Sequence, residues 1–70
     1  MTDTPFELRG DHITLDALLK AVGAADSGGA AKGLIASGAV RVNGEVDTRR
    51  GRKLRRGDRV QLGDQGWLLQ

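Results

Sequence analysis

The chain has 70 residues, which is enough for one small domain but leaves little room for a deep catalytic cleft. It has no cysteine, which excludes disulfides and thiolate zinc sites, and no apolar run near the ~20 residues of a membrane span. The net charge is −2 over residues 1–40, +5 over 41–59 and −1 over 60–70, and this segregation favours a surface that faces a polyanion over the alternative of a solvated basic loop.

The N-terminal segment is expected to contribute little to the fold. We predict one domain over residues 1–70, with residues 1–5 frayed at its start. Phe6 and Leu8 alternate with charged residues, which predicts a short strand. The segment is acidic and lacks the apolar core of a secretion signal, so we expect a cytoplasmic protein.

The first helix is predicted over residues 14–22. Four apolar residues recur at the spacing of a single helical face: Leu15, Leu18, Leu19 and Val22. Thr14 can cap the start of this helix, and Gly23 can supply the left-handed cap at its end. We therefore expect the apolar stripe to pack into the core.

The second helix is predicted from about Gly28 to Ser37. Ser27 is the favoured N-cap, with Asp26 as its rival, and Gly38 ends the helix. Three apolar residues share one face of it: Ala31, Leu34 and Ile35. This face is expected to meet the stripe of the first helix in the core.

Two glycines, Gly28 and Gly29, occupy the first turn of the second helix. Each costs about 1 kcal/mol relative to alanine in a helix. Their presence suggests close approach at the helix start, either by another backbone or by a phosphate. A nucleoside triphosphate loop is disfavoured, because that motif ends in Gly-Lys-Ser/Thr and Lys32 is followed here by Gly33.

Asn43-Gly44 lies between alternating apolar residues and predicts a two-residue hairpin, because both residue types tolerate positive φ. Three valines are expected on the core face and two charged residues on the opposite face: Val40, Val42 and Val46, against Arg41 and Glu45. Four cations follow the hairpin: Arg49, Arg50, Arg52 and Lys53. A rigid turn therefore delivers a cluster of positive charge to one place.

Three further short strands are predicted after the basic segment, from the alternation of apolar and polar residues. Their apolar members are Leu54, then Val60 and Leu62, then Trp67 and Leu69. Trp67 is expected in the core rather than as a platform for base stacking. The fold class is therefore α+β, with two N-terminal helices packed on a small, mostly antiparallel sheet.

No group of residues in the sequence is typical of catalysis. There is no Ser/His/Asp arrangement at credible spacing, no carboxylate pair in an apolar setting and no cluster of metal ligands. His12, the single histidine, is expected at the surface or in a turn. We therefore predict a protein that is not an enzyme and needs no cofactor or metal.

The motifs together resemble a known family. The chain is similar to the small RNA-binding domain first recognised in ribosomal protein S-four, also called the alpha-L motif, and within it to the stand-alone bacterial YbcJ-type proteins. The matching residues are Ser27-Gly28-Gly29, Ala31-Lys32, Ile35, Gly38, Val40, Val42-Asn43-Gly44-Glu45-Val46, Thr48-Arg49-Arg50, Arg52-Lys53-Leu54 and Gly57-Asp58. The wider family often has arginine at the positions of Thr14 and Gly28, and both changes remove an expected phosphate contact.

The resemblance implies binding of structured, often ribosomal, RNA across the second helix and the edge of the hairpin. With the charge pattern, it assigns to RNA binding Ser27, Gly28, Gly29, Lys32, Arg41, Asn43, Arg49, Arg50, Arg52 and Lys53. A surface rich in arginine and poor in aromatic residues suits reading of the RNA backbone. We expect a monomer that binds RNA, with the ribosome or a ribosomal subunit as candidate partner, and no membrane.

Two alternatives belong to other functional classes. A protein-interaction adaptor that docks on an acidic partner is the first. Sequence-specific DNA binding is the second, and it is disfavoured because no helix carries a row of base-reading side chains. Salt-dependent binding to structured RNA, compared with duplex DNA and protein partners, would separate these functions.

Overall fold

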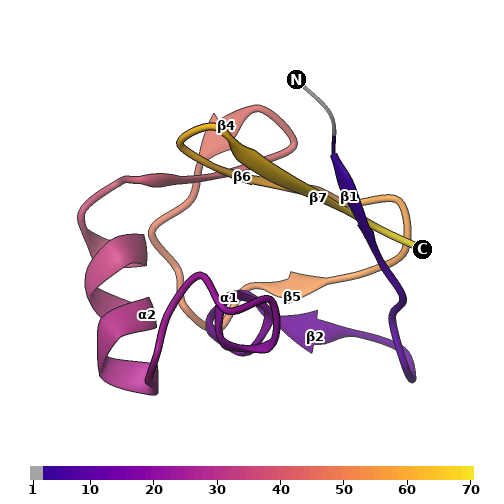
Figure 1. Cartoon of the computed structure of the whole chain (residues 1–70), viewed down its shortest axis with the longest axis horizontal. Helices are drawn as coiled ribbons and strands as arrows, with labels where there is room; N and C mark the ends of the chain where they lie inside the picture. Colours follow the sequence, from indigo (N-terminus) through magenta and orange to yellow (C-terminus); the bar gives the residue numbers. More distant parts are fainter. Residues whose placement is uncertain (1–2) are drawn as a thin grey trace.

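The computed structural model of the chain describes residues 3–70, which form two helices, a five-stranded sheet and a two-stranded ribbon (Figure 1). The strands are β1 (Thr4–Phe6), β2 (Ile13–Thr14), β3 (Val40–Val42), β4 (Glu45–Val46), β5 (Lys53–Leu54), β6 (Arg59–Leu62) and β7 (Gln65–Leu69), and the helices are α1 (Leu15–Ala21) and α2 (Gly28–Ala36). The sheet has the order β1-β7-β6-β3-β4, and β2 pairs with β5. The β1–β7 pair is parallel and the other pairs are antiparallel, which confirms the predicted α+β class.

β1 corrects part of the prediction for the N-terminus. Residues 1–5 were expected to be frayed, but Thr4–Phe6 pairs in parallel with Trp67–Leu69 at the edge of the main sheet. Met1 and Thr2 lie outside the described residues. The partner of β1 is at the far end of the sequence, so no local pattern could indicate this pairing.

α1 begins at Leu15, with Thr14 at its N-cap position. The Thr14 hydroxyl does not accept a hydrogen bond from the helix; it donates to the Asp16 carboxylate at 2.6 Å, and this carboxylate also accepts from the Ala17 N–H at 2.8 Å. The bond from Thr14 is the main cause that lowers the pKa of Asp16. Gly23 follows the helix with φ +78°, the left-handed conformation that the sequence predicts.

α2 begins at Gly28, and the Ser27 hydroxyl accepts a hydrogen bond from the Ala30 N–H at 3.1 Å. Ser27, rather than Asp26, is therefore the N-cap. A Cβ added at Gly28 would have no neighbour within 4 Å, and one at Gly29 would meet only the Ser27 Oγ at 3.9 Å. Within residues 3–70, no other backbone makes the close approach to this turn that the glycines suggest.

The β3–β4 connection places Val46 on the opposite face of the sheet from the one predicted. Asn43-Gly44 joins the strands with φ values of 53° and 88°, and the register sets Val42 opposite Glu45 and Arg41 opposite Val46. Because directly opposed residues share a face of the sheet, Val46 lies on the Arg41 face and is 49% exposed. The prediction that Val46 faces the core is wrong, since a two-residue turn aligns positions 42 and 45 and turns position 46 outward.

The core lies between the main sheet and the helical layer. Figure 1 shows α1 and the β2–β5 ribbon below the main sheet, with α2 beside them. The largest fully buried side chains come from both layers: Leu15, Leu18, Leu19, Ile35, Leu54, Leu69, Val40 and Val60. Trp67 is also buried, as predicted, whereas Leu34 and Leu62 are only partly buried at the margin. The predicted apolar faces of both helices therefore do meet the sheet.

Leu18 provides a test of this packing, because its side chain has no exposed surface. We expect Leu18→Ala to lower the free energy of unfolding by about 2–5 kcal/mol, through lost burial and a residual cavity. Urea denaturation followed by the fluorescence of Trp67 would measure the change. Lys20→Ala on the exposed side of the same helix is the control, with an expected change within about 0.5 kcal/mol. An unchanged midpoint for Leu18→Ala would contradict the placement of α1.

Candidate nucleic-acid interface

The segment between β4 and β5, residues 47–52, is attached to the start of α1. The Leu15 N–H donates to the Arg52 carbonyl at 2.9 Å, and the Asp16 N–H donates to the Arg50 carbonyl at 3.1 Å. The first N–H groups of a helix have no acceptor within the helix, so these two hydrogen bonds satisfy donors that would otherwise lack a partner in the protein. The backbone of the basic segment is therefore a structural part of the fold and not a loose loop.

Asp47 lies at the start of this segment and is only 6% exposed. Its Oδ1 accepts from the backbone N–H of Arg49 at 2.9 Å and from its Nε at 3.1 Å, and its Oδ2 accepts from the Nη2 of Arg49 at 2.9 Å. The same Oδ2 accepts from the Nη1 of Arg52 at 2.8 Å. The carboxylate thus holds two guanidinium groups, one of them through the two-point contact that the planar arginine fork favours. We call Asp47, Arg49 and Arg52 the Asp47 cluster.

The hydrogen bonds from Arg49 are the main cause that holds the pKa of Asp47 far below its ordinary value, with burial acting in the opposite direction. The same contact raises the pKa of Arg49. A carboxyl group whose pKa is lowered by folding stabilises the folded state above its unfolded pKa of about 3.9, and this contribution disappears as pH falls toward the folded pKa. Asp47 is therefore ionised at neutral pH and stabilises the fold there.

The two arginines of the Asp47 cluster differ from the carboxylate in exposure. The Arg49 side chain is 69% exposed and that of Arg52 is 29% exposed. A shallow polar depression borders the cluster, and its lining consists of Val42, Glu45, Val46, Asp47, Thr48, Arg49 and Arg52. The negative charge is therefore buried, and the positive charges are presented toward solvent.

Asn43 links the hairpin turn to the start of β6. Its Nδ2 donates to the Asp58 Oδ1 at 3.1 Å, and its Oδ1 accepts from the Arg59 N–H at 3.0 Å. The Asn43 N–H also donates to the Arg59 carbonyl at 2.8 Å. Both the oxygen and the nitrogen of the Asn43 amide therefore form hydrogen bonds within the chain. The sequence predicts that Asn43 binds RNA, whereas in the structure its side chain holds the turn against the start of β6.

Four of the predicted RNA-binding cations are exposed and take part in no ion pair within residues 3–70: Lys32, Arg41, Arg50 and Lys53. Arg41 projects from β3, and its Nη1 donates to the Gly44 carbonyl at 3.3 Å. The start of α2, residues 27–29, is also exposed. No hydrogen bond or ion pair among the described residues connects this helix start to the Asp47 cluster. Within the predicted RNA-binding set, the Asp47 carboxylate therefore joins Arg49 and Arg52, while the start of α2 remains separate from them.

Two other arginines, which follow β5 in the sequence, hold the N-terminal segment in place. Arg56 donates to the carbonyls of Leu8 at 3.0 Å and Gly10 at 3.1 Å, and Arg59 is paired with Asp3 at 2.6 Å. Net charge alone cannot distinguish these arginines, which contact the N-terminal segment, from arginines that have no such contact. Only their distant partners show the difference.

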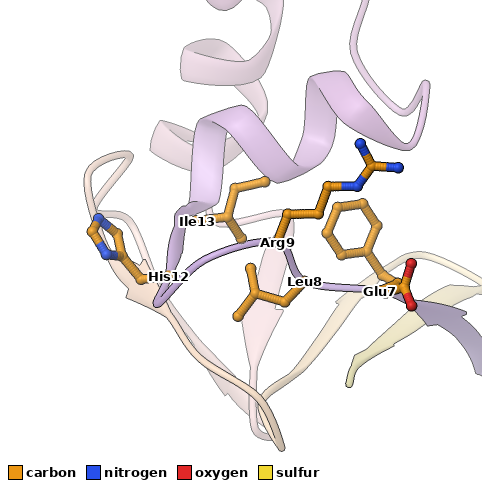
Figure 2. Close-up of a pocket in the computed structure, with 6 residues that line it drawn as sticks. Glu7, Leu8, Arg9, His12 and Ile13 are labelled. Carbon is orange, nitrogen blue, oxygen red and sulfur yellow. The ribbon is translucent and has the colours of Figure 1, made fainter.

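A second depression lies beside the N-terminal segment, and Figure 2 shows the residues that line it: Phe6, Glu7, Leu8, Arg9, His12 and Ile13. The His12 ring and the Glu7 carboxylate point away from each other, at opposite ends of the lining (Figure 2). These titratable groups therefore do not converge on one point. Among residues 3–70 there is also no group of three or more side chains that could hold a metal ion, and neither described helix is long and apolar enough to cross a membrane.

These features define a small α+β domain in which a basic segment is attached to both a hairpin and a helix. The chain belongs to the S4 domain family, whose model matches residues 6–68. It is also 43% identical over 58 residues to a protein of Bacillus subtilis (strain 168) named "Probable ribosome maturation protein RlbA", and the match covers 83% of this chain and 82% of that protein. The comparisons confirm the family resemblance found in the sequence.

Removal of the Asp47 charge tests the cluster. We expect Asp47→Asn to lower the free energy of unfolding at pH 7 by about 1–3 kcal/mol, because charge-assisted hydrogen bonds to both arginines are weakened. The difference from the parent should shrink as pH falls from about 5 toward 2, since the parent then loses the contribution of the ionised carboxylate. Urea denaturation at several pH values would measure both effects.

Asp64→Asn is the matched control for this experiment, because it removes the same charge from an exposed turn. Its effect should stay within about 0.5 kcal/mol. Equal stability of Asp47→Asn and the parent at pH 7 would show that the cluster does not stabilise the fold.

Proposed function

We propose that the chain is a non-catalytic RNA-binding protein that contacts structured RNA through its basic segment. One observation carries the proposal: residues 41–59 have a net charge of +5 in a chain that belongs to the S4 domain family. A concentrated positive surface attracts the phosphate backbone whatever the base sequence. Several of these cations are exposed and are not used in ion pairs within the described residues.

The relative in Bacillus subtilis suggests which RNA is bound. Its name describes that protein as a "Probable ribosome maturation protein". For this chain we infer ribosomal RNA, in a ribosomal subunit or in a particle that is still being assembled, and the cytoplasm as the place of action. The chain would bind such a particle as a monomer.

The proposed contact surface combines the start of α2, the hairpin and the segment up to β5. Its residues are Ser27, Gly28, Gly29, Lys32, Arg41, Asn43, Arg49, Arg50, Arg52 and Lys53. Free N–H groups at a helix start suit a phosphate, and the space around Gly28 and Gly29 leaves room for one. Arginine adds bidentate contacts, and lysine adds a point charge.

The lack of exposed aromatic side chains favours structured RNA over single strands. The chain has one Trp, one Phe and no Tyr, and Trp67 is buried in the core. Proteins that bind single strands rely on aromatic platforms for the bases. RNA duplexes instead present phosphates and 2′-hydroxyl groups, which arginine and lysine can contact without reading bases.

The salt dependence of binding tests the proposal. If about four phosphates are neutralised, log K should fall with log salt at a slope of roughly −3. Arg50→Ala should weaken binding across many structured RNAs and flatten this slope by about 1. Arg55→Ala is the matched control: it removes the same charge from an exposed residue beyond the other end of β5, and its effect should be smaller. Fluorescence anisotropy at several salt concentrations would provide both numbers, with circular dichroism confirming the fold.

Two outcomes would contradict the proposal. If the parent protein binds structured RNA with no salt dependence, or not at all at low salt, RNA is not the partner, and an acidic protein becomes the leading alternative. If Arg50→Ala and Arg55→Ala weaken binding equally, the charge acts without a defined surface.

Crosslinking in cells would identify the RNA. Irradiation followed by sequencing of the RNA fragments bound to this chain should enrich ribosomal RNA segments that form duplexes. A variant with both Arg50 and Lys53 replaced by alanine should lose this enrichment. Enrichment of other RNA classes alone would show that the inference from the Bacillus subtilis relative does not apply to this chain.

A further inference from the structure

The Asp47 cluster brings two positive side chains to one oxygen atom. The Nη2 of Arg49 lies 2.9 Å from the Asp47 Oδ2, and the Nη1 of Arg52 lies 2.8 Å from the same atom. Two guanidinium groups would repel each other if placed side by side alone. The shared carboxylate offsets this repulsion, so both arginines are held in one defined arrangement before any ligand arrives.

Each guanidinium still has unused donors. A guanidinium carries five N–H donors. Arg49 uses its Nε and Nη2 within the cluster and Arg52 uses its Nη1, and no further side-chain hydrogen bond of either residue occurs within residues 3–70. The carboxylate is 6% exposed, whereas the Arg49 side chain is 69% exposed. Donors are therefore available on the solvent side of a buried anion.

We propose that Asp47 is a positioning residue for RNA: its buried carboxylate holds Arg49 and Arg52 as a pair whose remaining donors bind one backbone phosphate. This inference rests on the proposed function. Its physical basis is preorganisation, because a long side chain that is already ordered loses less conformational freedom when it binds. The polar depression beside the cluster gives a phosphate access to both arginines.

The positioning role and simple electrostatics predict opposite changes in RNA affinity for Asp47→Asn. Asp47→Asn removes a negative charge from a surface that binds a polyanion, so charge alone predicts tighter binding. Loss of positioning predicts weaker binding instead, by about tenfold, because two arginines must then be ordered by the RNA. The sign of the change therefore separates the two explanations.

Glu45→Gln is the matched control. Glu45 lines the same depression and is exposed, and it forms no ion pair or side-chain hydrogen bond among the described residues. Its neutralisation removes the same charge without releasing an arginine. We expect Glu45→Gln to bind a structured RNA hairpin as tightly as the parent or tighter, while Asp47→Asn binds about tenfold more weakly and with a salt slope flattened by about 1.

A second set of variants separates positioning from a general loss of fold. In a chain with Arg49 and Arg52 both changed to alanine, Asp47→Asn should cause no further loss of affinity, because nothing remains for it to position. Arg52→Lys keeps the charge but loses the planar fork, and it should also weaken binding. This variant replaces Asp47→Asn as the test if circular dichroism shows that Asp47→Asn is unfolded under the assay conditions.

The outcomes distinguish this inference from the proposed function. Salt-dependent binding by the parent, with Asp47→Asn as tight as the parent or tighter, would overturn the positioning role and leave RNA binding intact. Equal binding by Arg52→Lys and the parent would also overturn it. Absence of RNA binding by the parent would refute the proposed function itself.

Discussion

The buried carboxylate of Asp47 is the point on which the arrangement of the basic segment depends. A carboxylate removed from water must be paired and hydrogen-bonded, and Asp47 meets this requirement with Arg49 and Arg52. The segment that carries these arginines also supplies the carbonyl groups that cap α1. One short stretch of chain thus connects the hairpin, the first helix and the exposed arginines.

The cations of residues 49–59 make different contacts, although the sequence presents them as one basic run. Arg56 and Arg59 hold the N-terminal segment through carbonyl groups and Asp3. Arg49 and Arg52 are ordered by Asp47, while Arg50 and Lys53 extend toward solvent without an ion pair in the described part of the chain. A 70-residue domain has few apolar groups to stabilise it. Arg49 and Arg52 stabilise the fold through Asp47, and they remain partly exposed, so in the proposed function they can also contact RNA.

Membership of the S4 domain family and the likeness to a protein named "Probable ribosome maturation protein RlbA" agree with the proposal that the positive surface binds phosphates. The proposed mode of binding needs no catalytic group and no aromatic platform. Its specificity would come from the fixed positions of a few cations, which must match the spacing of phosphates on a folded RNA. In the proposed mode of binding, the rigidity of the hairpin and of the basic segment would matter as much as their charge.

The sequence by itself determined the elements whose signals are local. The periodicity of Leu15, Leu18 and Leu19, the Ser27 cap and the alternation in the C-terminal strands were enough for both helices and the α+β class, because these depend on neighbours a few residues away. Tertiary structure decided what depends on distant partners: the pairing of β1 with β7, the carbonyl anchors of Arg56, and the burial of Asp47. In the sequence, Asp47 cannot be told from a solvent-exposed residue of the basic run, because the groups that bury it are set by the fold. The outward orientation of Val46 likewise depends on the strand register across the turn.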